Sequence, residues 1–161
     1  MLSIQIFYLP KPQTQDYHLT ISSSTDKIYD LHAYLYDQDG NVNVLNQNGL
    51  IGPNKTDSFT ISFDQQSSDN SKNTKIVTFQ SLIDDINEAK SLNLIKPWIA
   101  DTLIRLTKSS QKNYDKGRKQ IAKIQLNVFE NIIKSIRKSP LIKEDAYQIL
   151  LYDVRYLQNN P

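Results

Sequence analysis

The chain has 161 residues, a formal net charge of +2, no cysteine, and hydrophobic residues at 39% of its positions. This length suffices for one ordinary domain or two small ones, and the lack of cysteine excludes disulfides, thiolate metal sites and a cysteine nucleophile. No apolar run approaches the roughly 20 residues of a membrane-spanning helix, and no signal-peptide pattern opens the sequence. If the protein is exported, we therefore expect its leader to be already removed or to lie outside this sequence.

The charge is distributed unevenly along the chain. Residues 1–74 contain four Lys and Arg against eight Asp and Glu, a net charge of −4, whereas residues 75–161 contain 15 against nine, a net charge of +6. This split predicts either two domains that attract each other or a basic half that meets an anionic polymer or surface.

The first 66 residues alternate between apolar and polar side chains with the period of two that is typical of half-buried strands. At 37–41 a turn contains Gly40, which is free to adopt a positive φ, and separates two of these segments as in a hairpin. Strands are expected at 2–8, 17–21, 28–36, 42–45 and 59–63. Five strands with turn residues between them predict a small antiparallel β-sandwich over residues 1–66.

The segment at 67–77 is expected to be a polar linker, because Ser, Asn and Asp are frequent here and apolar periodicity is missing. Beyond it, apolar residues recur at spacings of three and four through residues 78–161, which predicts four amphipathic helices. Ser81 with Asp84 predicts a capping box at the first helix, and Pro97 suits the first turn of the second. The predicted fold class is therefore segregated α+β, with a β-sandwich followed by a four-helix bundle.

Within the helical half, residues 79–158 resemble the FIMAH domain, a helical module of extracellular bacterial and archaeal proteins. The matching segments are Leu94-Ile95-Lys96-Pro97-Trp98-Ile99, Tyr114-Asp115-Lys116-Gly117 and Leu141-Ile142-Lys143-Glu144-Asp145-Ala146, together with Leu103, Leu106, Ala122, Leu126, Phe129 and Leu150. The chain departs from the family at Asn93, where Gly is common. The resemblance implies a noncatalytic accessory or adhesion module on the cell surface, without catalytic residues.

A possible calcium site is suggested by Asp37, Asp39 and Asn41, which place oxygen ligands at alternate positions. An EF-hand is excluded because Gly40 stands fourth rather than sixth and Asn48 occupies the twelfth position. Either a looser calcium loop, completed by Asp30 or Asp57, or a plain hairpin turn fits the pattern. A second metal hypothesis joins His18 and His32 to Asp30.

Basic residues crowd the region around Tyr114, where they could bind phosphate, an acidic glycan or nucleic acid by charge neutralisation. The candidate ligand-binding residues are Trp98, Tyr114, Lys116, Arg118 and Lys119. A solvated helix surface explains the same charges. Trp98 and the tyrosines of the last helix fit either core packing or an aromatic platform for a sugar ring or a partner chain. No nucleic-acid motif accompanies the basic cluster, so nucleic acid is not an expected partner.

These patterns favour a noncatalytic binding or adhesion module of the cell exterior or envelope, with no cofactor apart from the possible calcium ion. Its partner would be a protein or a cell-surface glycan. The alternative is a structural subunit of a larger envelope assembly or filament, in which the oppositely charged halves of neighbours meet. A metal-dependent enzyme that uses His18, His32 and Asp30 ranks last.

Overall fold

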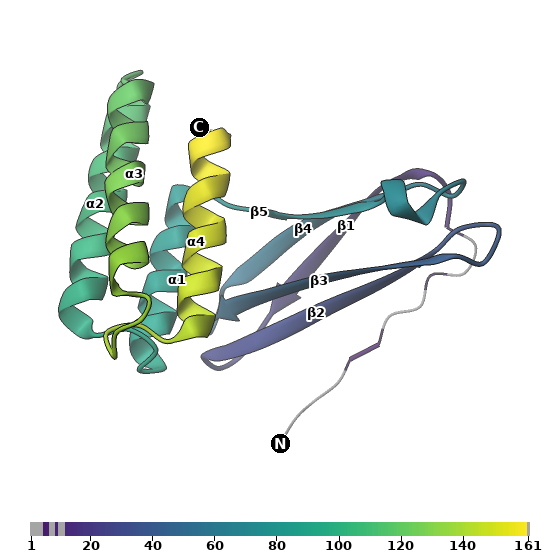
Figure 1. Ribbon diagram of the computed structural model, residues 1–161, viewed down its shortest axis with the longest axis horizontal. Coiled ribbons are helices and arrows are strands. Elements are labelled where there is room, and N and C mark those ends of the chain that lie inside the picture. Colours follow the sequence, from purple (N-terminus) through teal and green to yellow (C-terminus); the bar gives the residue numbers. More distant parts are fainter. Residues whose placement is uncertain (1–4, 7–8, 10–11, 161) are drawn as a thin grey trace.

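The computed structural model describes residues 5–6, 9 and 12–160, in which strands occupy the N-terminal half and helices the C-terminal half (Figure 1). The fold class is therefore α+β, as the periodicities predict. The strands are β1 (Gln15–Ser22), β2 (Lys27–Tyr36), β3 (Val42–Ile51), β4 (Thr56–Phe63) and β5 (Lys72–Ile76), and a short 3-10 turn, η1 (Ser68–Asn70), precedes the last. The helices are α1 (Phe79–Ser91), α2 (Pro97–Asp115), α3 (Lys119–Ile136) and α4 (Glu144–Asn159).

The strands form two antiparallel sheets. One has three strands in the order β1-β4-β5, and the other is the β2-β3 hairpin. Leu19 of β1 pairs with Phe59 of β4, which in turn pairs with Lys75 of β5. The Tyr29 ring of β2 meets the Phe59 ring edge to face, with centroids 6.4 Å apart, so the two sheets face each other at this point.

The predicted linker at 67–77 contains η1 and the whole of β5, and this part of the prediction was wrong. Polar side chains hid the strand because β5 lies at the sheet edge, where its residues alternate between the interior and solvent. Its inward residue Lys75 is fully buried. The strand predicted at 2–8 lies largely outside the described residues.

The first helix begins at Phe79, so its N-cap lies three residues before Ser81, the predicted cap. Thr78 is the N-cap, and its Oγ1 accepts a hydrogen bond of 3.0 Å from the Ser81 backbone N–H. The Ser81 hydroxyl accepts one of 2.8 Å from the Thr78 N–H, which completes a capping box. Pro97 opens α2 as predicted, because proline at the first helical position loses no intrahelical hydrogen bond.

Apolar residues from all four helices pack into one buried cluster. Its largest fully buried members include Leu82, Ile86, Leu103, Leu126, Phe129, Ile133, Ile149, Leu150 and Val154. Leu50 of β3 and Val77, which follows β5, belong to the same cluster. The strand half thus contributes side chains to the helical core, and the junction between the halves is itself packed. No helix in the described part of the chain is both long and apolar enough to cross a membrane.

Candidate functional site

The end of the α2-α3 hairpin is fixed by a small polar network. Asn113 Nδ2 donates to Gln125 Oε1 at 3.0 Å, and Gln125 Nε2 donates to Ser109 Oγ at 2.7 Å. The buried Ser110 hydroxyl donates to the Ala122 carbonyl at 2.8 Å. Between the helices, Gly117 adopts a φ of +72°, which suits a residue without Cβ. This end of the molecule therefore presents its surface side chains from an ordered scaffold.

Positive charge is concentrated on this hairpin end. Residues 105–123 contain seven Lys and Arg and one acidic residue, Asp115, a net charge of +6. This equals the net charge of the whole C-terminal half. None of the seven lies within 4 Å of a carboxylate of the described residues, although Lys and Arg elsewhere form eight such contacts. The hairpin end is thus a cluster of cations that have no carboxylate counterion among the described residues.

The structure brings together four of the five predicted ligand-binding residues. Tyr114 lies in the last turn of α2 with its ring 5.7 Å from that of Phe79, and Lys119 Nζ lies 5.3 Å from the Tyr114 ring centroid, a cation–π contact. Lys116 and Arg118 lie in the intervening turn and are exposed. Trp98 is 60% exposed but sits at the opposite end of α2, about 24 Å away at 1.5 Å per residue. It therefore does not belong to the same site.

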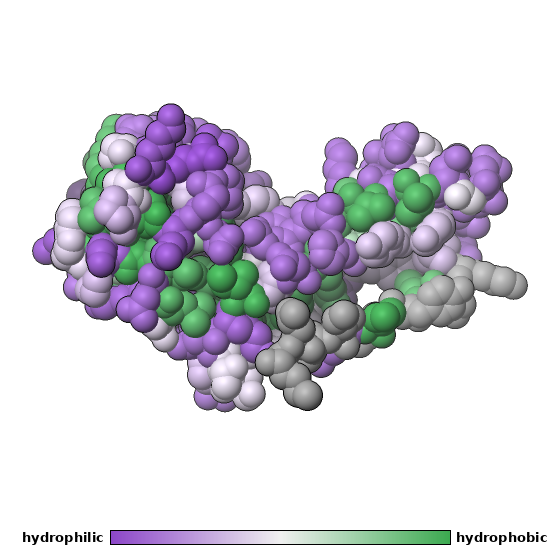
Figure 2. Space-filling view, turned by 60° about the horizontal axis from the view of Figure 1, so that its bottom comes forward, coloured by the Kyte–Doolittle hydropathy of each residue, from purple (hydrophilic) through white to green (hydrophobic). Residues whose placement is uncertain are grey.

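An exposed apolar row runs along α3 beside the cations. Ile121, Ile124 and Val128 recur at spacings of three and four, and Ile124 is 60% exposed. They neighbour Gln125, the residue that contacts α2, so the row borders the hairpin seam. Figure 2 shows that hydrophobic patches lie among hydrophilic residues on one face of the molecule.

A second surface feature is a shallow groove of about 410 Å³ along the C-terminal turns of α4. It is lined by Gln148, Leu151, Tyr152, Arg155, Tyr156, Asn159 and Asn160. Two tyrosine rings, those of Tyr152 and Tyr156, lie 6.5 Å apart with an interplanar angle of 28°. The groove is therefore both aromatic and rich in amides.

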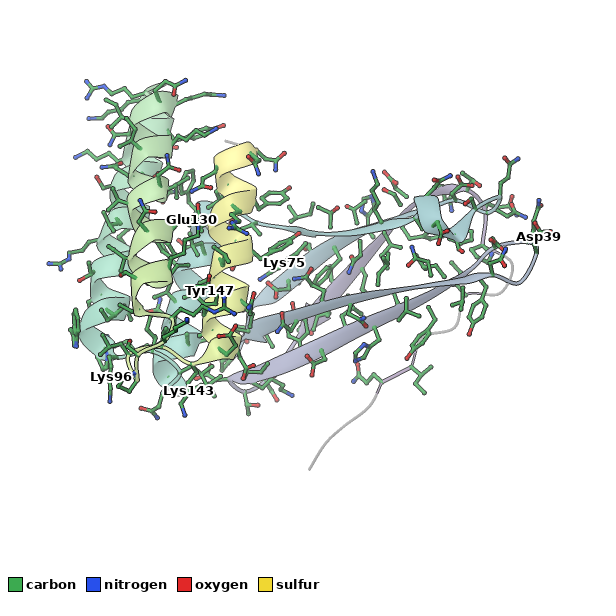
Figure 3. All side chains as sticks on the ribbon, in the orientation of Figure 1. Asp39, Lys75, Lys96, Glu130, Lys143 and Tyr147 are labelled. Atoms are coloured by element: carbon green, nitrogen blue, oxygen red, sulfur yellow. The ribbon has the colours of Figure 1, made fainter. Side chains whose placement is uncertain are left out.

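The junction between sheets and helices contains a buried charge cluster around Lys75 (Figure 3). Its ammonium nitrogen lies 2.7 Å from Asp85 Oδ2 of α1, 3.3 Å from Asp57 Oδ2 of β4 and 3.5 Å from Asp153 Oδ1 of α4. The Tyr29 hydroxyl of β2 donates a hydrogen bond to Asp57. Three elements besides β5 thus meet at one lysine, and β2 joins the cluster through Asp57.

Because the cluster has one cation and three carboxylates, Asp57, Asp85 and Lys75 bind their protons more tightly than they would in water. Burial, followed by the charge of Asp153, raises the pKa of Asp85 well above its usual range, and burial raises that of Asp57. Burial would lower the pKa of Lys75, but the charges of Asp153, Asp85 and Asp57 outweigh it and raise that pKa. Lys75 is consequently a protonated amine, which is not a nucleophile.

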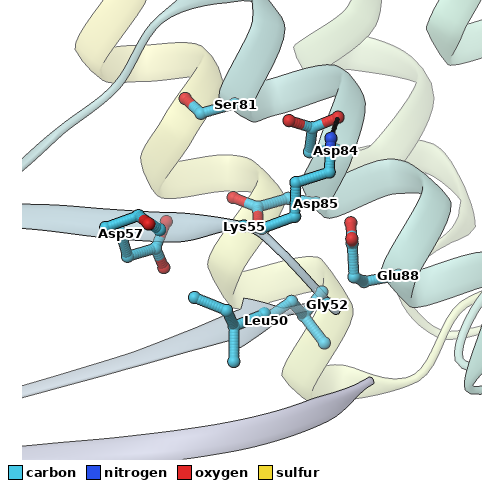
Figure 4. Close-up of a pocket in the computed structure, with 10 residues that line it drawn as sticks. Leu50, Gly52, Lys55, Asp57, Ser81, Asp84, Asp85 and Glu88 are labelled. Carbon is cyan, nitrogen blue, oxygen red and sulfur yellow. Dashed lines mark hydrogen bonds and ion pairs between the residues drawn. The ribbon is translucent and has the colours of Figure 1, made fainter. Parts of the chain in front are cut away.

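Beside the cluster is a cavity of about 30 Å³, room for one water molecule (Figure 4). Lys55 lines it and donates to Asp84 Oδ1 at 2.8 Å. Glu88 also lines it, is 7% exposed, and has no hydrogen-bond partner for Oε2 in the described structure. Burial, together with the charges of Asp85, Asp84 and Asp26, raises the pKa of Glu88 to about 7. The cavity is too small for an organic substrate.

The turn at 37–41 uses Asp37 as an internal cap. Asp37 Oδ1 accepts from the backbone N–H of Asn41 at 2.8 Å and of Asp39 at 3.1 Å, and Oδ2 accepts from the Asn41 side chain at 3.1 Å. The backbone N–H of Ser68 also donates to Oδ2, at 3.3 Å. These hydrogen bonds lower the pKa of Asp37 although desolvation opposes them. Nitrogen donors thus engage both oxygens, as a hairpin turn requires.

The two histidines of the metal hypothesis lie in different sheets. His18 of β1 contacts Thr60 at 3.3 Å, and His32 of β2 contacts Asn46 at 2.6 Å. Across the described residues, no group of three or more His, Asp or Glu side chains is placed to hold a metal ion. The structure therefore does not assemble His18, His32 and Asp30 into a metal centre, and calcium binding by Asp37, Asp39 and Asn41 stays a prediction.

No model of a protein family and no curated protein matches this sequence. The resemblance to the FIMAH domain remains a prediction.

Sequence reasoning missed the Lys75 cluster, and of the α4 groove it suggested only the tyrosines, as one of two interpretations. Lys75 was hidden in the supposed linker, and its partners are spread over residues 57 to 153. The spacing of Gln148, Tyr152, Tyr156 and Asn159 along one face of a helix could have indicated the groove.

Proposed function

We propose that the protein is a noncatalytic binding or adhesion module of the cell exterior or envelope, in which the helical half holds an anionic partner. The observation that carries this proposal is the net charge of +6 on residues 105–123, where no cation is paired with a carboxylate of the described chain. The partner of matching chemistry is an acidic cell-surface glycan or an acidic protein surface.

The architecture that we propose for this module is a β-sandwich that extends through β5 to Ile76, followed by a FIMAH-like four-helix bundle over 78–161. The contact between Tyr29 and Phe59 supports sheets packed face to face. Support for a bundle comes from the buried cluster shared by all four helices. Lys75 is protonated and the adjacent cavity admits one water molecule, so neither favours catalysis.

Cations without internal counterions favour an external polyanion for a simple reason. A paired lysine loses an existing interaction when a ligand binds, whereas an unpaired one releases only water and mobile ions. The cation–π contact between Lys119 and Tyr114 leaves the ammonium charge intact. Binding at this site is therefore expected to weaken steeply as salt increases.

The experiment measures binding of the full chain to fluorescent heparin, an acidic glycan probe, between 50 and 500 mM salt. We expect Lys112→Glu with Lys116→Glu to abolish salt-dependent binding, because the two substitutions reverse two charges and lower the net charge of the hairpin end by four. The matched control, Lys138→Glu with Lys143→Glu, makes the same change in net charge between α3 and α4, where Figure 3 shows Lys143. Equal loss in both variants, or binding independent of salt, would refute a defined anion-binding end. Duplex DNA serves as a second probe, and preferential binding to it would contradict the glycan assignment.

A second candidate, a subunit of an assembly, is favoured by the opposite end of the molecule. The turn at 37–41 and η1 lie far from α2 and α3 along the long axis (Figure 1). This end bears Asp37, Asp39, Asp64 and Asp69, and the neighbouring β2-β3 hairpin exposes Tyr34, Tyr36, Val42 and Val44. An acidic, apolar end is complementary to the basic, apolar end of another copy, and such head-to-tail contacts can propagate.

This second candidate makes a distinctive prediction for mixtures of variants. Asp39→Lys with Asp69→Lys blocks one end, and Lys112→Glu with Lys116→Glu blocks the other. Neither variant is expected to self-associate, but each keeps one competent end, so equal amounts should form a one-to-one dimer in light scattering. A monodisperse monomer of the unaltered protein at all concentrations would exclude the assembly and leave the glycan proposal untouched.

A further inference from the structure

The groove on α4 has the shape and position of a ligand subsite separate from the basic hairpin end. Its residues recur at intervals of three, four and eight positions, so one helical face supplies them, while the opposite face packs into the core. The volume of about 410 Å³ lies within the usual range for small-molecule sites. In Figure 1 the last turns of α4 rise beside the end of β5, where the two halves meet.

The aromatic part of the groove is preorganised. The Tyr152 hydroxyl accepts a hydrogen bond of 3.1 Å from the Lys75 backbone N–H, which ties this ring to β5. The Tyr156 ring follows one turn later at 6.5 Å. Both side chains are partly exposed. Two fixed tyrosine rings offer apolar faces to a flat ligand while their hydroxyls remain polar.

The polar part of the groove supplies donors and acceptors around these rings. Gln148 Nε2 donates to Glu144 at 2.6 Å, which leaves its carbonyl oxygen as an acceptor. Asn159 is exposed and its side chain makes no hydrogen bond to any described residue. An amide both donates and accepts, so it can bind the hydroxyl groups of a sugar, which also do both.

The groove carries almost no net charge. Arg155 is the one charged residue that lines it, and its Nε donates to Glu130 Oε1 at 2.9 Å. Charge therefore selects neither an anion nor a cation here. A neutral ligand with an apolar face and a rim of hydroxyl groups can stack on the tyrosine rings and hydrogen-bond to the amides at the same time. A pyranose ring has both features.

We propose that the α4 groove is a binding subsite for a neutral saccharide, with Tyr156 and Tyr152 stacking on the sugar face and Asn159 and Gln148 binding its hydroxyls. Its ligand chemistry differs from that of the basic end. A polymer with neutral and acidic sugars could contact both surfaces, but each can bind without the other.

The test uses saturation-transfer NMR on the full chain with three neutral disaccharides, cellobiose, maltose and chitobiose. Side-chain amide resonances report where the ligand sits. At least one disaccharide is expected to bind, to shift the amides of Asn159 and Gln148, and to bind equally at 50 and 500 mM salt. Tyr156→Ala should weaken binding about tenfold, the loss of one good stacking contact.

Two further variants keep the result interpretable. Asn159→Ala changes an exposed residue at the end of α4, so it should leave the fold intact but weaken binding. Tyr114→Ala removes an aromatic residue at the hairpin end and should leave disaccharide binding unchanged. Absence of binding by all three sugars at millimolar concentration, or binding unaffected by both groove variants, would overturn the proposal. Tighter binding of adenosine than of any sugar would also do so, since it would show a general stacking site.

Discussion

Replacing Glu88 with Gln should stabilise the protein at neutral pH, which is unusual for a buried charged residue. The unfolded chain releases this proton near pH 4.5, whereas the folded protein holds it until about pH 7. Glu88 therefore contributes its full stabilisation below pH 4.5, and this contribution is lost as the pH rises through 7. The physical cause is burial, reinforced by the charges of Asp85, Asp84 and Asp26.

The gain in stability expected for Glu88→Gln follows from the pKa shift of Glu88. A change from 4.5 to about 7 corresponds to roughly 3 kcal/mol at about 1.4 kcal/mol per pH unit, and partial access of water lowers it to about 2 to 3 kcal/mol. Gln has nearly the same shape and cannot ionise. Urea unfolding of both proteins from pH 4 to pH 9 should give equal free energies at pH 4, and the Gln variant should be the more stable by this amount at pH 8.

Glu130 provides a control of opposite sign. Hydrogen bonds from Lys134, Gln158 and Arg155 lower its pKa to about 2. Glu130→Gln should therefore destabilise the protein by about 1 kcal/mol above pH 4.5 and have no effect near pH 2. If the free energies of Glu88→Gln and the unaltered protein run parallel at all pH values, the assignment of a raised pKa to Glu88 is wrong.

Three further substitutions test the junction, the core and a helix cap. Lys75→Met should cost about 3 to 5 kcal/mol at pH 7, because it leaves the carboxylates unpaired, and less at pH 4, where the raised pKa values of Asp57 and Asp85 favour their protonated forms; equal losses in urea unfolding at both values would contradict this. Phe129→Ala should cost about 3 to 5 kcal/mol by thermal unfolding, whereas Val128→Ala, one residue away but exposed, should cost under about 0.5 kcal/mol; similar losses would mean that α3 is packed on its other face. Thr78→Ala should cost about 1 kcal/mol by the same assay, and no loss would place the N-cap of α1 elsewhere.

Hydrophobic periodicity predicted the order of strands and helices, but it could not detect β5. A strand that alternates Lys, Asn and Thr offers no apolar signal, and its place is set by pairing with β4. Periodicity alone also overestimates how many apolar residues of α3 are buried. Ile121 and Val128 fit a helical stripe, yet they are exposed because the neighbouring helices cover only the side that bears Ala122, Leu126 and Phe129.

The sequence also predicted the candidate site best where its residues are close together in the chain. Tyr114, Lys116, Arg118 and Lys119 are neighbours in sequence, so a helix end and a short turn were enough to keep them together. Trp98 was grouped with them by chemistry alone, and the length of α2 separates it.

The sequence by itself determined the succession of elements, the capping chemistry and the concentration of positive charge between residues 105 and 123, because each depends on residues a few positions apart. The tertiary structure alone decided that Lys75 is buried among Asp57, Asp85 and Asp153, and that α4 shows a groove of tyrosines and amides to solvent. Burial and pKa depend on which distant segments exclude water from a side chain, and periodicity carries no such information.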